Sequence, residues 1–283
     1  AARAMAAGGA LLALWLAAPA AATAPSGPLA RLATVQGAWY GVEQRLAALD
    51  GRPLAVPESY TPASDLEWGT APYGFEVAWR LACDGERLVG EHARSLLWSG
   101  CFIEGPTQTR EEWTSARAPA AVAAGAWAAT DGVGTAHLPL PYTASLRILE
   151  LKGEAPVHLE LGLIAAEGDR LSVLQLAHVR PTGALAAPPI LTALARGQEG
   201  GRRLAAERNK WAARAAEAWE ECGACGALRL PDGGSLLVTP GGEPAAEGES
   251  APFAVEFAWA GVRAALQWDG RAVSAFEVQG FEG

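Results

Sequence analysis

The sequence predicts an all-β protein built from antiparallel strands, and a repeated block carries that prediction. PYGFEVAW at Pro72–Trp79 returns as PFAVEFAW at Pro252–Trp259, and a shorter relative, PVHLELGL, lies at Pro156–Leu163. Each copy is a proline followed by strict alternation around a central glutamate. Period-two alternation is typical of a strand with one buried and one solvated face. Turn signals separate many such segments, so we expect a barrel or a sandwich.

The strand signals fall into two groups with one helical segment between them. The first group opens at Val35–Leu49, includes the hairpin Phe75–His92 and closes with a meander over 144–180. Arg203–Glu221 carries the sustained helical pattern, and Gly226–Phe281 reads as a final antiparallel unit. We therefore expect an apolar segment and linker at 1–28, a β-barrel at 29–182, a helical connection at 183–222 and a second, shortened β unit at 223–283.

The charge balance excludes one class of partner. The net charge is −9 at pH 7, and the basic residues are scattered along the chain, with Arg202 and Arg203 the one adjacent pair. A nucleic-acid-binding protein needs a basic stripe to neutralise phosphates. We expect no nucleic-acid partner.

The N-terminal segment Met5–Ala24 carries no charge. As a helix it is long enough to cross a bilayer's hydrocarbon core of about 30 Å. The alternative is a cleavable signal that ends at Ala22–Ala24, although Pro25 is a poor residue just after such a cut. If the segment is retained it anchors the protein in a membrane, and if it is removed the protein is lumenal.

Cysteine spacing leaves several interpretations open. Cys222 and Cys225 have the spacing of redox pairs and zinc ligands, yet a second ligand pair at suitable spacing is missing. We favour a pair of small turn residues or a local disulfide, so both cysteines are weak metal candidates. Cys83 and Cys101 lie in neighbouring strand-like segments that can bring them together, which the sequence does not decide.

Tryptophans dominate the aromatic residues, and several fall in strands of the first group. They can line a pocket for a flat apolar ligand such as a chlorophyll derivative, a carotenoid or a lipid, or they can fill the core. Two histidines on one predicted hairpin can approach each other, either as ligands of a pigment metal or as hydrogen-bonded core groups. The pocket candidates are Trp39, Trp79, Trp98, Trp113, His158 and His178.

No recognisable catalytic motif accompanies these strands. The sequence contains no nucleophile elbow, phosphate loop, zinc-protease motif or dinucleotide fingerprint. Glu76, Glu160 and Glu256 occupy the same place in the repeated block, which favours a shared structural role such as pairing with an arginine on a neighbouring strand. We expect a non-enzymatic protein with no catalytic residues.

Two groups of residues resemble a known family. Gly37-Ala38-Trp39 is similar to the Gly-x-Trp signature of lipocalin-like barrels. The resemblance implies that Trp39 packs across the closed end beneath an arginine of the last strand, for which Arg180 is the candidate. The run LRLPDGGSLLVTP, the block PFAVEFAW and the closing RAALQWDGRAVSAFEVQGFE resemble the end of an uncharacterised tandem lipocalin-like (calycin-type) family of cyanobacteria, algae and plants.

This resemblance implies a lipocalin-like barrel, a plastid location and a photosynthetic context. The main hypothesis is a thylakoid-associated accessory, assembly or linker subunit of a membrane complex, with photosystem or antenna subunits as partners. The alternative is a carrier of an apolar pigment, tetrapyrrole or lipid. A bilin-lyase-like or de-epoxidase-like enzyme is a further alternative that rests on fold analogy alone.

Overall fold

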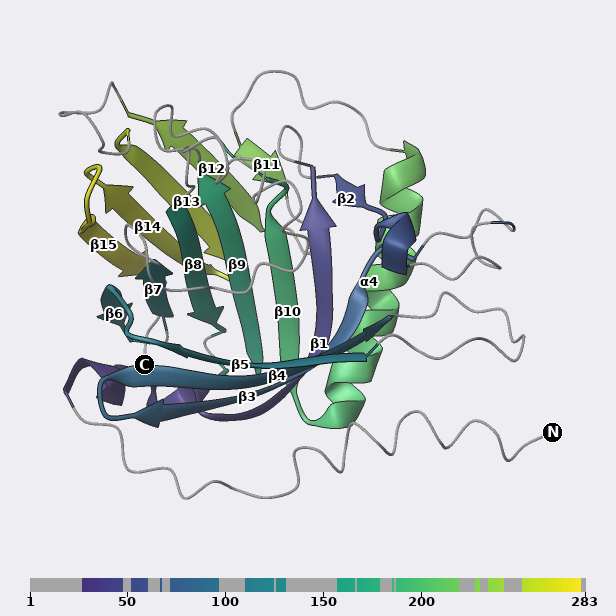
Figure 1. Ribbon diagram of the computed structural model, residues 1–283, viewed down its shortest axis with the longest axis horizontal. Coiled ribbons are helices and arrows are strands. Elements are labelled where there is room, and N and C mark those ends of the chain that lie inside the picture. Colours follow the sequence, from purple (N-terminus) through teal and green to yellow (C-terminus); the bar gives the residue numbers. More distant parts are fainter. Residues whose placement is uncertain are drawn as a thin grey trace.

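The structure is a computed structural model of the 283-residue chain. It describes residues 27–47, 52–60, 67, 72–96, 110–124, 126–130, 157–165, 167–178, 185, 187–218, 227–229, 234–241 and 251–280. The described part is mostly β, with one curled antiparallel sheet, a second small sheet and few helices, which confirms the predicted fold class in its main outline (Figure 1).

The first sheet has ten strands in the order β5-β4-β3-β1-β10-β9-β8-β7-β6, with the short β2 paired to β1. All of its pairings are antiparallel. The strands are β1 (Gly37–Leu46), β2 (Pro53–Leu54), β3 (Phe75–Asp84), β4 (Arg87–Leu96), β5 (Arg110–Arg117), β6 (Ala121–Ala123), β7 (Ala126–Thr130), β8 (Val157–Ile164), β9 (Arg170–His178) and β10 (Ile190–Arg196).

The order of these strands makes the sheet curl around an interior. β5 and β6 stand at opposite ends of the order, yet only residues 118–120 separate them along the chain. The first long strand, β1, pairs with the last, β10, from Trp39↔Arg196 to Arg45↔Ile190. The sheet is therefore a curled, half-barrel arrangement of antiparallel strands.

Side chains alternate between two apolar clusters on the two sides of this sheet. One cluster takes residues from strands all round the curl, so it lies inside; this side is called the interior below. Its largest members are Trp39, Trp79, Trp127, Phe75, Leu32, Leu81 and Leu88. The other cluster includes the outward residues of β7, β8 and β9, which alternate with the inward ones as strand geometry requires.

A short 3-10 helix, η2 (Gly27–Val35), packs at one end of the interior. Trp39 lies above it, fully buried, and its indole Nε1 donates a hydrogen bond to the Val35 carbonyl at 2.7 Å. The Arg196 guanidinium stacks on the Trp39 ring at 3.8 Å from its centroid. It also donates to the carbonyls of Gln36, at 2.7 Å, and Thr34.

The arginine above Trp39 therefore belongs to β10, and the expectation that Arg180 has this position was wrong. Arg196 is the register partner of Trp39 in the β1–β10 pair, which places it directly beside the indole ring. Arg180 lies outside the described residues. The first sheet consequently extends past residue 182, where the sequence predicted its end, and the predicted helical connection contains its last strand.

The second sheet is an antiparallel meander in the order β11-β12-β13-β14-β15. Its strands are β11 (Ala227–Arg229), β12 (Ser235–Pro240), β13 (Phe253–Trp259), β14 (Val262–Trp268) and β15 (Val273–Gln279). Alternate residues of β13 and β14 are buried against the outward side chains of β7, β8 and β9. Both faces of β8 are thus covered, so nearly all of its residues are buried although apolar and other residues alternate along it.

Helix α4 (Gln198–Ala218) lies on the outside of the first sheet, against β1 and β10 (Figure 1). Its alanine Ala205 packs with Val42 and Ala193 of these strands. At Gly201 an added Cβ would lie 2.6 Å from the Tyr40 carbonyl carbon, so this glycine permits the close approach of helix and sheet. The helical pattern predicted for Arg203–Glu221 is confirmed over the described part of α4.

The expected apolar N-terminal helix, Met5–Ala24, lies outside the described residues. Over the part of the chain that the structure describes, no helix has both the length and the apolar character needed to span a membrane.

Trp39→Ala tests the closed end. The substitution removes a fully buried indole, its hydrogen bond to Val35 and the surface on which Arg196 stacks. We expect the free energy of unfolding to fall by about 3–5 kcal/mol, the range for deleting a large buried side chain. Urea denaturation measures this change.

Glu277→Ala on the exposed side of β15 is the control and should alter stability by no more than about 0.5 kcal/mol. A Trp39→Ala protein that unfolds like its parent would contradict the packing.

Candidate functional site

The interior of the first sheet holds a group of buried polar side chains beside its apolar cluster. Buried charges are rare in proteins unless they are paired, so their arrangement identifies the candidate site. They come from strands distributed round the curl. The buried polar residues whose strand position faces the interior are Glu43, His92, Arg94, Ser115, Arg117, Glu160, Gln175 and Thr192.

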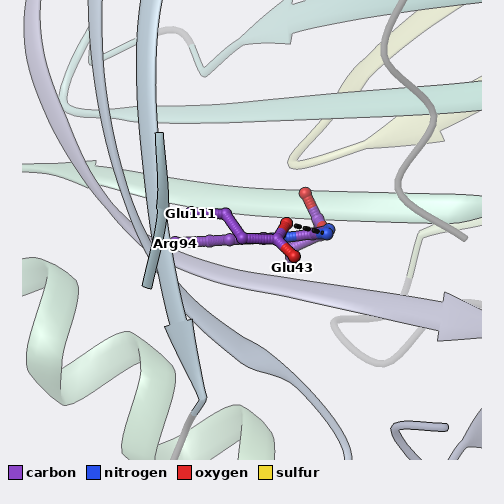
Figure 2. A network of polar contacts seen from close by, with 3 residues as sticks. All are labelled: Glu43, Arg94 and Glu111. Carbon is purple, nitrogen blue, oxygen red and sulfur yellow. Dashed lines mark hydrogen bonds and ion pairs between the residues drawn. The ribbon is translucent and has the colours of Figure 1, made fainter. Parts of the chain in front are cut away.

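Arg94 on β4 lies between two carboxylates (Figure 2). Its Nη1 is 3.1 Å from Glu43 Oε1 on β1, and its Nε donates to Glu111 Oε2 on β5 at 2.8 Å. The guanidinium also stacks over aromatic rings, at 4.8 Å from the Phe75 centroid and 5.5 Å from the Trp113 centroid. Burial raises the pKa of Glu43, and Arg94 offsets part of that rise.

Glu160 on β8 is the centre of a second buried network. Its Oε1 accepts a hydrogen bond from Trp127 Nε1 at 2.8 Å and lies 2.7 Å from Arg117 Nε. Its Oε2 accepts from Gln175 Nε2 at 3.2 Å. An added Cβ at Gly162 would lie 2.2 Å from the Trp127 ring, so this glycine leaves the space in which the indole reaches Glu160. The carboxylate has partners on both oxygens, as a fully buried charge requires.

A third set of contacts joins Arg117 to an aromatic group. Ser115 Oγ accepts from Arg117 Nη1 at 2.6 Å and lies 2.7 Å from His92 Nε2. The His92 ring is edge-on to Trp79, with centroids 4.5 Å apart, and stacks on Trp113 at 5.3 Å. We call Trp79, His92, Trp113, Ser115 and Arg117 the His92 cluster.

The His92 imidazole is held in its neutral form. Burial, and secondly the positive charge of Arg117, lower the pKa of His92 well below its ordinary value. It is therefore an uncharged donor and acceptor near neutral pH, and it does not add a cation to the cluster.

Four polar atoms of the His92 cluster make no hydrogen bond among the described residues: Trp79 Nε1, His92 Nδ1 and the Nε and Nη2 of Arg117. Of these, Arg117 Nε is still in an ion pair with Glu160. Each belongs to a side chain that is at most 6% exposed. A buried donor without a partner costs about 1–3 kcal/mol. Native proteins leave few such groups, and an unseen water, ion or ligand is one explanation for those that occur. Because contacts link Trp79, His92, Ser115 and Arg117 in turn, we treat them as one candidate site.

The structure brings together only part of the sequence-predicted pocket. Trp79 and Trp113 both flank His92, whereas Trp39 belongs to the closed end. His158 lies on β8, and the predicted hairpin is confirmed by the pairing Val157↔His178. Nothing is described of the His178 side chain. Trp98, Cys101, Cys222 and Cys225 lie outside the described residues.

Cys83 is the one cysteine among the described residues. Cys83 is a buried free thiol. In the described ranges, no group of three or more histidine, cysteine or acidic side chains is arranged to hold a metal ion.

The repeated glutamates do not share one role, contrary to expectation. Glu256 pairs with Arg263 on the adjacent strand β14, as predicted, but on an exposed face. Glu160 pairs across the interior with Arg117 of β5, which is not a neighbour of β8. Glu76 faces outward from β3, where burial raises its pKa and Arg202 of α4 counteracts that rise. The repeat preserves strand alternation, while the side of the sheet that the glutamate occupies differs from copy to copy.

Sequence reasoning missed the polar residues that define the site. His92 and Arg94 on β4, and Ser115 and Arg117 on β5, each follow the period-two spacing that places side chains on one face. That spacing was a usable signal. It was obscured because small alanines alternate with the polar residues and the polar face of such a strand is normally assigned to solvent.

With this geometry in hand, we compared the chain with known proteins. No family model, curated protein or solved structure matches it.

Glu43→Gln tests the electrostatics of the Arg94 network. A carboxyl with a higher pKa in the folded than in the unfolded chain binds protons more tightly when folded. The ordinary pKa of this carboxyl is 4.5, and its pKa in the folded chain is higher. Ionisation of Glu43 therefore lowers the stability of the protein as the pH rises from 4.5 through the folded pKa. The variant lacks this titration. As the pH increases, we expect the free energy of unfolding of Glu43→Gln to rise relative to that of the parent protein. Urea denaturation across that pH range measures both.

The control is Val42→Ala, which changes a buried, non-ionisable neighbour on the same strand. It should lower stability by a similar amount at every pH. A Glu43→Gln difference that is equally independent of pH would contradict the buried position of the carboxyl.

Proposed function

We propose that the chain is a lipocalin-like binding protein whose first sheet encloses a small, largely apolar ligand. The observation that carries this proposal is the His92 cluster, where buried polar atoms without a hydrogen-bond partner lie beside the apolar cluster of the interior. Ligand sites typically combine an apolar lining with a few placed polar groups. The interior has this composition.

Two features of the fold support the lipocalin-like part of the proposal. The strand order returns from β10 to β1, and β5 leads directly into β6, as in an up-and-down barrel. The closed end joins η2, the Gly37–Trp39 segment and Arg196 in the arrangement that the sequence resemblance implied. Chlorophyll derivatives, carotenoids and lipids remain the proposed ligand classes.

The expectation of a non-enzymatic protein also stays a prediction. Ser115 and His92 lie within hydrogen-bond distance, but both are buried, and His92 Nδ1 faces no carboxylate among the described residues. This arrangement fits ligand binding better than base-assisted nucleophilic catalysis, in which a third group orients the base.

Bromohexadecane is a direct probe of interior binding, because bromine quenches indole fluorescence on contact. We expect saturable quenching with one ligand per chain. Trp113→Phe should reduce the quenched fraction, since Trp113 stacks on His92 inside the first sheet. Trp268→Phe is the matched control, because Trp268 is equally aromatic but belongs to the second sheet.

The control variant should leave the quenched fraction unchanged. Quenching that does not saturate, or that disappears in Trp268→Phe and persists in Trp113→Phe, would contradict binding inside the first sheet.

A second candidate function is the accessory, assembly or linker subunit of a photosynthetic membrane complex in the thylakoid. One observation favours it. In the part of the chain that is described, β11 and β15 each pair on one side only, and β15 carries no fully buried side chain. Such an edge can accept a strand from a partner. Co-migration of the protein with isolated thylakoid complexes is the expected result, and its recovery only in the free soluble fraction would contradict this function.

A further inference from the structure

We propose that the ligand presents an uncharged carbonyl group to the His92 cluster, where Trp79 Nε1 and Arg117 Nη2 donate hydrogen bonds to it. This inference rests on the proposed binding function and specifies the chemistry of the ligand. The ligand class is an apolar ester, ketone or aldehyde, in preference to a hydrocarbon or a carboxylate.

The first argument is the balance of donors and acceptors. The indole N–H of Trp79 and the guanidinium of Arg117 can donate hydrogen bonds but cannot accept them. Both retain a buried nitrogen without a partner in the described structure. The group that satisfies them must supply oxygen lone pairs, and a pure hydrocarbon has none.

The connection between these donors is continuous. Trp79 contacts the His92 ring, His92 lies 2.7 Å from Ser115 Oγ, and Ser115 accepts from Arg117 at 2.6 Å. Apolar residues of the interior cluster, including Val77 and Leu88, lie on the same strands and the same face. These surroundings match a ligand with an apolar body and one polar group.

The second argument is the charge inventory of the interior. Arg117 already faces Glu160, and Arg94 already faces both Glu43 and Glu111. The two fully buried arginines of the interior thus each have a carboxylate partner. Beside Arg117, a ligand carboxylate would add a second negative charge to a cation that Glu160 already pairs, which is unfavourable in a buried position.

His92 does not alter that inventory. The imidazole is buried at 2% exposure between two indoles and beside Arg117, an environment that opposes a positive charge. A neutral carbonyl oxygen accepts hydrogen bonds without changing the net charge. It therefore fits both arguments.

Three ligands with the same apolar chain separate these cases: methyl palmitate, palmitate and hexadecane. Titration calorimetry or competition with bromohexadecane gives the dissociation constant of each. We expect methyl palmitate to bind at least about tenfold more tightly than hexadecane, the equivalent of one or two net hydrogen bonds. Palmitate should bind more weakly than methyl palmitate.

Trp79→Phe removes the indole donor and keeps an aromatic ring. The ratio of the hexadecane to the methyl palmitate dissociation constant should fall about fivefold or more in this variant. Trp268→Phe, in the second sheet, is the matched control and should preserve the ratio. If Trp79→Phe does not fold, the comparison of the three ligands on the parent protein still decides the question.

The outcomes distinguish this inference from the proposed function. Equal binding of hexadecane and methyl palmitate, or tightest binding of palmitate, would overturn the carbonyl assignment and leave interior binding intact. An unchanged ratio in a folded Trp79→Phe protein would overturn the role of the Trp79 donor. Failure of all three ligands to bind would overturn the proposed function itself.

Discussion

The ion pair between Arg117 and Glu160 is the interaction around which the interior is organised. Neither charge can remain buried alone, because removing one partner of such a pair typically costs several kcal/mol. Trp127 and Gln175 occupy the remaining positions on the carboxylate, and Ser115 links the arginine to His92. Since these groups come from β4, β5, β7, β8 and β9, the pair is satisfied only when the sheet curls.

A second constraint acts from outside the curl. β8 presents Val157 and three leucines to the outer side, and β9 presents apolar side chains to both sides, so both strands need cover on the outer side as well. The second sheet supplies that cover through Phe257, Trp268 and their neighbours. Its five strands thus act as a layer over the first sheet, and the pairing Glu256–Arg263 lies on the opposite, exposed face. The repeated block thus occurs in both sheets, with Glu160 on the interior side of the first sheet and Glu256 on the exposed face of the second.

The sequence was informative where local pattern decides structure. Strict alternation located β3, β8 and β13, and Gly37-Ala38-Trp39 correctly indicated a buried indole at the end of the first sheet. It failed at β10, because the alanine-rich ILTALAR lies between a proline-rich stretch and a helix and carries a weak strand signal. The partner of Trp39 was misassigned for that reason, since only the β1–β10 register identifies Arg196.

The candidate site was harder to predict, for a physical reason. Alternation shows that His92 and Arg94 share a face, but it does not show which face is inside. Contacts across the interior between strands that do not pair, such as the ion pair of Glu160 with Arg117, depend on how the whole sheet curls. Charged residues facing inward run against the ordinary pattern, and they are favourable here only because each finds a partner that the linear sequence does not reveal.

The central claim is that the Trp79 indole N–H is a buried donor that a ligand carbonyl satisfies. The resonance of this indole proton can be followed directly by NMR. It is assigned as the indole signal that is missing from the spectrum of Trp79→Phe. Saturation with methyl palmitate should move this resonance downfield and slow its exchange with solvent, while the Trp268 indole resonance stays in place. A Trp79 resonance that does not respond to bound methyl palmitate would contradict the account.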